Sequence, residues 1–279
     1  MGTTRELTAA GLGAAAAAAA VTALWLRRPP PWFLARWMAP EVRRGASDAS
    51  SRQAELLARP HRQPLTLYLI RHGQSQANTK MHLVGGRDVA SPLTAKGAAQ
   101  AQAVGRRLAK DGLRFDRIYA SHAVRARRTA ELACNELGVP ASTVQVEQRV
   151  VEFSQGRHEL QPRSEVYAPD GPVMRGITAE RMFYRPPGIS PDGNRGESQH
   201  DVELRFRAFV DELQATQEGP LTVAVFSHGI AIKSFVRGLI GADVDFTVHA
   251  ETGNCSLTVL EYKPALVNLG GWVLRCFNA

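Results

Sequence analysis

A chain of 279 residues, 44% of them hydrophobic, is long enough to bury one sizeable core, and this composition excludes global disorder. The net charge of +8 would suit a nucleic-acid-binding protein. However, residues 1–62 hold nine arginines against four acidic residues, so the rest of the chain carries only +3. That remainder shows no zinc-ligand spacing, aromatic-rich basic patch or basic helical repeat. We therefore expect no nucleic-acid partner and favour a small anionic substrate.

The three cysteines are isolated from one another. Cys134, Cys255 and Cys276 form neither a CxxC pattern nor an even disulfide framework. We interpret them as structural thiols in a reducing compartment, and we predict no metal site and no other cofactor.

The first 28 residues form an apolar segment that differs from the rest of the chain. Residues 7–26 contain no charged side chain and could just span a bilayer, although many of them are alanine. Arg27 and Arg28 follow this stretch, so a retained anchor would leave the C-terminal part on the cytosolic side of a membrane. A cleaved organelle-targeting peptide is an alternative, as is an alanine-rich helix of a soluble cytoplasmic protein.

Residues 29–64 are rich in Pro, Arg, Ala and Ser, which is typical of a linker. We expect the full-length chain to sediment with membranes, and a shorter chain that starts at Pro64 to stay in the supernatant. Recovery of the full-length chain at its intact mass in a high-speed supernatant would contradict the membrane anchor.

Predicted strands and helices alternate over residues 65–279. Apolar residues have strand spacing before Thr94 and helix spacing after it, and Thr94 itself is a good N-cap for the helix that follows. We expect strands or extended segments at 65–70, 115–120, 143–153, 221–226, 255–261 and 272–277, and helices at 95–110, 123–137, 198–217 and 230–239. In the helix at 198–217, the side chains available to the core are Val202, Leu204, Phe206, Phe209, Val210 and Leu213. The pattern predicts an α/β fold, a three-layer sandwich with a mostly parallel central sheet, preceded by the N-terminal apolar helix.

Two predicted strands end in the same way, with a histidine and a glycine. One strand runs into Arg71-His72-Gly73 and another into Ser227-His228-Gly229. In open α/β sheets, ligands bind at the carboxyl ends of the strands, so both histidines are candidate site residues. Arg125 is predicted in the first turn of a helix, next to amides that favour anions, and Glu152 ends an extended segment.

Further motifs lie between and around these residues. In chain order, the segments are Arg71-His72-Gly73-Gln74-Ser75-Gln76-Ala77-Asn78, Gly86-Arg87, Pro92-Leu93-Thr94-Ala95-Lys96-Gly97, Ser121 through Thr129, Glu152, Gly196-Glu197-Ser198 and Ser227-His228-Gly229. Their order resembles the histidine phosphatase superfamily, also called the phosphoglycerate mutase-like family, over residues 65–262. The resemblance implies that residues 65–279 form a catalytic domain that works through a covalent phosphohistidine.

The resemblance also implies the role of each residue. His72 is the expected nucleophile, because a neutral imidazole can attack phosphorus near pH 7. Glu152 is expected to protonate the leaving group and then to accept a proton from the attacking water. Arg71, Arg125 and His228 are expected to stabilise the transferred phosphoryl group, which makes them catalytic as well. The residues expected to bind the substrate are Arg71, Gly73, Ser75, Asn78, Arg125 and His228. No metal is needed in this scheme.

Some assignments have competitors. Glu159 is the second candidate for the acid, and His82 and His122 lie close enough to the motifs to line a pocket. The family often continues the turn after Gly156 with an aromatic residue, Glu and Gly, whereas here Arg157-His158-Glu159-Leu160 follows, so we expect an altered pocket wall. The Pro- and Gly-rich insertion at 161–195 is expected to lie over the site as a loop and to select the substrate.

We therefore expect a phosphomonoester hydrolase that acts on a phosphorylated small molecule or a phosphoprotein. A mutase of the phosphoglycerate type is the first alternative, since it would use the same nucleophile and clamp. A membrane-tethered interaction protein that uses the fold as a docking surface is the second. The candidate leaving groups include sugars, inositols, nucleosides and proteins, and the sequence does not choose among them.

Overall fold

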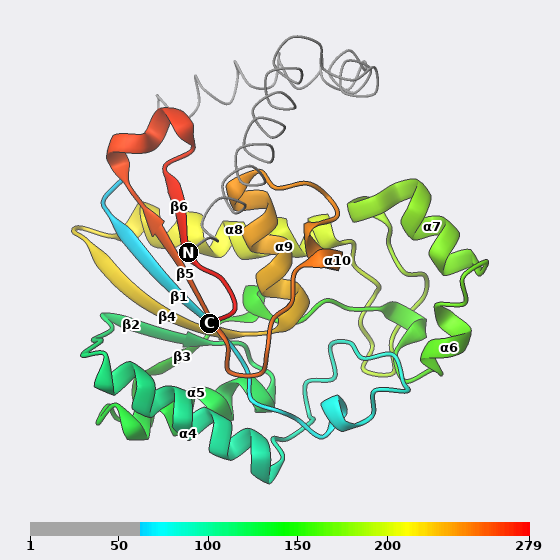
Figure 1. Cartoon of the computed structure of the whole chain (residues 1–279), viewed down its shortest axis with the longest axis horizontal. Helices are drawn as coiled ribbons and strands as arrows, with labels where there is room; N and C mark the ends of the chain where they lie inside the picture. Colours follow the sequence, from blue (N-terminus) through cyan, green and yellow to red (C-terminus); the bar gives the residue numbers. More distant parts are fainter. Residues whose placement is uncertain (1–61) are drawn as a thin grey trace, which may run out of the picture. The chain divides into compact units, whose positions relative to one another are not determined.

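The computed structural model describes residues 62–279, so the expected apolar segment and nearly all of the expected linker lie outside the described residues. One six-stranded sheet runs through this part of the chain in the order β3-β2-β4-β1-β5-β6 (Figure 1). The strands are β1 (Leu65–Arg71), β2 (Arg117–Ala120), β3 (Val144–Val146), β4 (Leu221–Ser227), β5 (Leu257–Tyr262) and β6 (Trp272–Cys276).

The sheet is mixed but mostly parallel. β1, β2, β3 and β4 are parallel, whereas β5 runs antiparallel to β1 and β6 antiparallel to β5. Only the short 3₁₀ helix η6 (Pro264–Leu269) connects β5 to β6, which is too little chain for a parallel crossover. The predicted α/β class is thus confirmed, with an antiparallel edge added to it.

Helices cover both faces of the sheet. Figure 1 shows α4 (Ala95–Lys110) and α5 (Val124–Glu136) on one face, and α8 (Gln199–Thr216) and α9 (Gly229–Ile240) on the other. The strands contribute side chains to the cores on both faces of the sheet, because alternate side chains point to opposite faces. Leu67 and Leu69 belong to the core under α8 and α9, and Ile70 to the core under α4 and α5.

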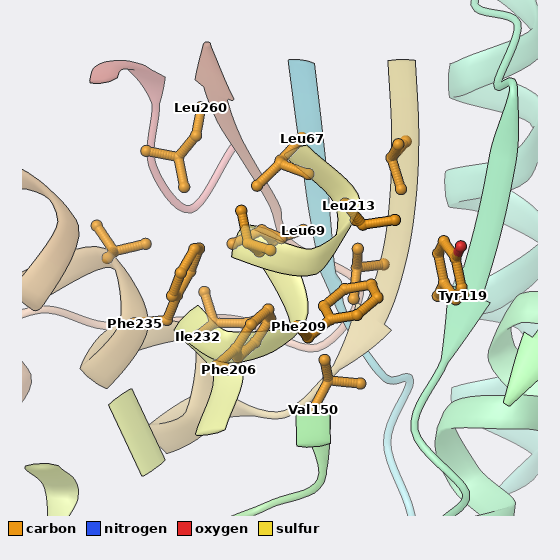
Figure 2. Packing of buried hydrophobic residues seen from close by; sticks show 14 of the residues in the cluster. Leu67, Leu69, Tyr119, Val150, Phe206, Phe209, Leu213, Ile232, Phe235 and Leu260 are labelled. Atoms are coloured by element: carbon orange, nitrogen blue, oxygen red, sulfur yellow. The ribbon is translucent and has the colours of Figure 1, made fainter. Parts of the chain in front are cut away.

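The larger core lies between the sheet and the helices α8 and α9. Figure 2 shows Leu67 and Leu69 of β1 facing Phe206 and Ile232, which come from these two helices. The rings of Phe206 and Phe235 stack with their centroids 4.4 Å apart. This packing fixes α9 against the end of β4, and the site described below depends on that junction.

The helix starts agree with the predicted caps. The Thr94 side chain accepts a hydrogen bond from the Gly97 amide, 3.0 Å away, and Ser198 forms a reciprocal capping box with Asp201 at the start of α8. One predicted core residue is wrong: Leu204 is 51% exposed. It lies two positions from both Val202 and Phe206, and a two-residue step turns about 200° around a helix, onto the opposite face.

The predicted strands at 115–120, 143–153 and 255–261 have different bounds in the structure. Phe115 precedes β2 and packs its ring against Tyr68, 5.3 Å between centroids. The extended segment at 143–153 pairs only over β3 and then forms the 3₁₀ helix η3 (Gln148–Val150). Cys255 precedes β5 with a φ of 58°, a conformation that cannot continue a strand.

The insertion at 161–195 is more ordered than the loop expected there. It contains α6 (Arg163–Val166), α7 (Pro172–Glu180) and the 3₁₀ helix η5 (Arg181–Phe183). Its apolar residues form a small cluster of their own, in which Val166 and Val173 are buried with Val84. The remaining elements are η1 (Ala77–Thr79), η2 (Ala141–Thr143), η4 (Gly156–His158) and α10 (Phe246–His249). No helix within residues 62–279 has the length and apolar character needed to cross a membrane.

Candidate active site

Strand register brings the two predicted histidines together. Arg71 of β1 lies opposite Ser227 of β4, so His72 and His228 leave the same edge of the sheet side by side. The His72 amide donates to the Ser227 carbonyl, 3.0 Å away, and the two imidazole centroids are 5.1 Å apart. Both rings are buried.

The hydrogen bonds of His72 define its tautomer. Its Nδ1 lies 2.7 Å from the Gly73 carbonyl oxygen, which can only accept, so Nδ1 carries the proton. Nε2 then has the free lone pair, and it accepts a hydrogen bond from Arg125 Nε at 3.1 Å. Burial, together with Arg125 and Arg71, holds the pKa of His72 well below its ordinary value. The imidazole is therefore neutral, and its Nε2 lone pair points in a fixed direction.

Two arginines flank this nitrogen. Arg125 is buried in the first turn of α5 and also donates to the Asp88 carbonyl. Arg71 donates from Nη1 to the Thr252 carbonyl at 2.6 Å, while its buried Nε has no hydrogen-bond partner within residues 62–279. Burial lowers the pKa of each guanidinium, although both remain cations near neutral pH. Such cations with unused donors suit the oxygens of a phosphoryl group.

His228 and Gly73 pack next to His72 but do not line the cavity described below. His228 Nε2 lies 2.9 Å from Ser121 Oγ, and burial, followed by Arg125, holds the pKa of His228 well below its ordinary value. Gly73 packs its α-carbon so close to Gly97 that a Cβ would overlap the Gly97 carbonyl. Direct contact of His228 or Gly73 with a phosphate stays a prediction.

Asn78 and Ser75 approach the same site from the segment after β1. The Ser75 amide donates to Asn78 Oδ1 at 3.1 Å, and both residues line the cavity. Asn254, which the sequence analysis did not single out, donates from Nδ2 to the His72 carbonyl at 3.0 Å and to Asn78 Oδ1 at 3.3 Å. Asn254 therefore ties the nucleophile's backbone to the predicted clamp residue Asn78.

Glu152 is anchored at the N-terminus of α9. Its Oε1 accepts from the amides of Phe153 (2.9 Å) and Ala231 (3.0 Å), and its Oε2 accepts from the amide of Ile230 (3.3 Å). The first turn of the helix has amides with no partner inside the helix, and here they hold the carboxyl group in place. Since α9 begins right after His228, the acid and the two histidines share one rigid junction.

The backbone of Glu152 is fixed by two further arginines. Arg87 Nε and Arg205 Nη2 each donate to the Glu152 carbonyl at 3.1 Å. Both guanidiniums pair with the Glu197 carboxylate, which lies 3.1 Å from Arg205 Nε and also bonds Arg87. A three-residue network, Arg87-Glu197-Arg205, thus sets the position of the candidate acid.

A cavity of ≈ 360 Å³ opens in front of His72. Six of the predicted site residues line this cavity: Arg71, His72, Ser75, Asn78, Arg125 and Glu152. A nucleophile, two cations and a carboxyl group therefore face one space, which is what transfer of a phosphoryl group to nitrogen requires. Within residues 62–279 there is no cluster of three or more potential metal ligands.

The comparisons with known proteins identify the family. The sequence profile of the histidine phosphatase superfamily (branch 1) matches residues 67–276. The chain belongs to this superfamily. It is 29% identical over 215 residues to the probable phosphoglycerate mutase GpmB of Escherichia coli O1:K1, an alignment that covers 76% of this chain and 91% of that protein.

Solved structures of the superfamily are similar as well. The mycobacterial glucosyl-3-phosphoglycerate phosphatase has 26% sequence identity and a TM-score of 0.64, with 78% of this chain and 100% of that chain covered. The alpha-ribazole phosphatase of Shigella flexneri has 25% identity and a TM-score of 0.57, with 77% and 96% covered. The family expected from the sequence is thus confirmed.

The competing candidates lie elsewhere in this histidine phosphatase fold. Glu159 is buried, and burial raises its pKa, but its carboxyl group accepts from the Gln155 amide (2.9 Å) and from Ser154 Oγ (3.1 Å) and lines a neighbouring cavity. His122 lines a different cavity from that of His72. His82 is exposed. The geometry therefore favours Glu152 over Glu159 as the acid.

We expect Glu197→Gln to lower the free energy of unfolding by about 2 to 3 kcal/mol, because two poorly exposed guanidiniums would lose their counter-charge. The matched control is Glu131→Gln, which removes the exposed partner of Arg128 and is expected to cost about 0.5 kcal/mol or less. Urea unfolding of both variants checks this. Equal losses in the two variants would contradict the importance of the Arg87-Glu197-Arg205 network.

Proposed function

We propose that the domain hydrolyses phosphomonoesters through a phosphohistidine on His72, with Glu152 as the proton donor. The observation that carries the proposal is that the free Nε2 of His72 and the carboxyl group of Glu152 line one cavity with Arg71 and Arg125.

In the first half of the reaction, His72 Nε2 attacks phosphorus and the bond from phosphorus to the ester oxygen breaks. The departing oxygen takes the proton of Glu152, so the alcohol leaves neutral. Arg71 and Arg125 stabilise the charge on the phosphoryl oxygens during the transfer. The proton stays on Nδ1, which donates it to the Gly73 carbonyl, and this hydrogen bond stabilises the positive charge that develops on the ring.

In the second half, water attacks the phosphorus of phospho-His72. The Glu152 carboxylate takes one proton from that water, the bond from phosphorus to Nε2 breaks, and inorganic phosphate leaves. The enzyme returns to neutral His72 and protonated Glu152. A single carboxyl group thus serves as acid and then as base.

Hydrolysis is supported by the names of the two similar structures, both of which are phosphatases. Transfer of the phosphoryl group between two positions of a phosphoglycerate is the second candidate, because the E. coli relative carries the name of a mutase. The two activities share the first half of the reaction and differ in the acceptor of the second.

The deciding experiment offers the enzyme an alkyl phosphate in ¹⁸O-labelled water, and in parallel 3-phosphoglycerate. The proposal requires inorganic phosphate that carries solvent oxygen and appears as fast as the ester disappears. Conversion of 3-phosphoglycerate to its 2-isomer with almost no free phosphate would overturn it in favour of the mutase.

A further inference from the structure

We propose that the leaving group of the substrate is an apolar chain, and not a sugar, an inositol or a glycerate. This inference rests on the proposed hydrolase function, and it concerns the outer part of the same cavity. Beyond the phosphate-binding residues, the wall is built mainly of carbon. Its apolar members are Phe153, Val173, Ile177, Pro186, Ile230 and Val248.

Half of these apolar residues come from the insertion at 161–195, and two of them, Val173 and Ile177, belong to its small apolar cluster. Val173 and Ile177 lie one turn apart on α7, so they present one continuous apolar stripe. Val173 is buried, and Ile177 packs against the same cluster. Figure 1 shows α7 and α6 beyond the sheet edge, with α10 between them and α9. The stripe on α7 and Val248 on α10 therefore border the cavity from different elements.

Several polar side chains on the wall are occupied by protein partners. The Tyr167 hydroxyl donates to Gln155 Oε1, and Gln199 Oε1 accepts from Thr247 Oγ1 at 2.6 Å. The Arg181 guanidinium pairs with Asp245 at 2.5 Å. A polyol would bring several hydroxyl groups to this wall, where few free acceptors remain. Each hydroxyl that loses water without a new partner weakens binding.

Arg163 is the remaining cation on this wall. Its Nε donates to the Met81 carbonyl at 3.2 Å, and its guanidinium lies 5.6 Å from the centroid of the Tyr167 ring. Stacked in this way, the side chain extends the apolar wall with its stem and keeps its charge toward water. A carboxylate on the substrate is the competing use of Arg163, and the experiment below includes it.

Val248 supports an apolar occupant independently. It lines the cavity and is nevertheless 70% exposed, so its methyl groups are accessible to solvent. An alkyl chain that extends from the phosphate site would cover Val248 and remove that surface from water, which is favourable in proportion to the area buried. A sugar would cover it without this gain.

The test compares ethyl, butyl and hexyl phosphate with glycerol 3-phosphate and 3-phosphoglycerate, all esters of primary alcohols. Among the alkyl esters we expect kcat/KM to rise about fourfold per methylene group. We expect hexyl phosphate to exceed glycerol 3-phosphate by on the order of 10². A flat alkyl series, with all esters hydrolysed, would overturn the apolar leaving group and leave the hydrolase intact.

Two further outcomes are distinguishable. A preference for 3-phosphoglycerate over hexyl phosphate would also overturn the proposal and would assign Arg163 to a substrate carboxylate. Failure to release phosphate from any ester would overturn the proposed function, and this inference with it.

A pair of valine substitutions locates the effect. Val248→Asn is expected to reduce the rise in kcat/KM from ethyl to hexyl phosphate several-fold, and the fold should persist because Val248 is exposed. Val146→Asn is the matched control, because Val146 is also exposed (52%) but lies on β3, away from the cavity wall. An identical chain-length series in both variants would overturn the role given to Val248 and its apolar wall.

Discussion

Substitution of His72 by alanine is expected to lower phosphate release by on the order of 10⁴ or more. His72 Nε2 is unprotonated because Nδ1 donates to Gly73, and its lone pair is aligned by the hydrogen bond from Arg125 in a residue that lines the cavity. Without it, water would have to attack the ester directly and the two-step path would be lost. The measurement is release of phosphate from hexyl phosphate, together with trapping of an acid-labile phosphoenzyme.

The control for this variant is His82→Ala, which removes an exposed imidazole and should leave both turnover and phosphoenzyme intact. Because His72 is buried against His228, thermal unfolding of His72→Ala and of a second variant, His72→Asn, must show that the fold persists. Turnover within tenfold of the wild type in a folded His72 variant would rule out the phosphohistidine path.

The pairing of His72 with His228 could be predicted because its causes are local. Each histidine follows a continuous apolar run, and such runs form buried parallel strands whose carboxyl ends meet at one edge of the sheet. The position of Arg125 was predictable for the same reason, since the helix signal begins next to it. In these three cases, short-range patterns fix the direction in which a side chain leaves its element.

Asn254 and Thr252 could not be found in this way. They reach His72 and Arg71 because β5 runs antiparallel to β1, which returns the segment before β5 to the edge where β1 ends. The apolar pattern of β5 indicates a strand but not its direction. Local sequence patterns therefore cannot predict which residues lie at the site when their position depends on the direction of a strand.

The arginines that position Glu152 illustrate a second limit. Arg205 lies three positions after Val202 and one before Phe206, at the border of the buried face of α8, and Arg87 lies in a loop. Many arginines at the edge of a buried helix face keep their guanidinium group in water, because the long side chain can bury its stem and expose its charge. Only the fold shows that Arg87 and Arg205 turn inward to Glu197.

The same limit applies to the insertion at 161–195. Its Pro and Gly content favoured a loop, whereas Val166 and Val173 of its two short helices pack with Val84, which is distant in sequence. Tertiary packing overrides local propensity in such segments. The position of the insertion beside the site was therefore predictable, while the helices that it forms there were not.

Glu152→Gln is expected to separate the two proton transfers of the reaction. The amide oxygen of glutamine can still accept from Phe153 and Ala231, and only the longer contact with the Ile230 amide is lost, so the side chain should keep its place, but its amide has no acidic proton to give. For hexyl phosphate, whose alkoxide needs that proton, we expect kcat/KM to fall by on the order of 10² to 10⁴. For p-nitrophenyl phosphate, whose leaving group needs none, kcat/KM should fall less than about tenfold.

With the aryl ester, the variant also lacks the base for the second step, so phospho-His72 should accumulate and appear as a burst of nitrophenol in rapid mixing. Glu159→Gln is the control: its carboxyl group bonds Ser154 and Gln155, so its loss should affect both esters alike and give no burst. If Glu152→Gln also reduced both esters equally without a burst, Glu152 would position the substrate and not carry protons. Unequal losses with accumulation would assign both transfers to this carboxyl group, since a purely structural role cannot depend on the basicity of the leaving oxygen.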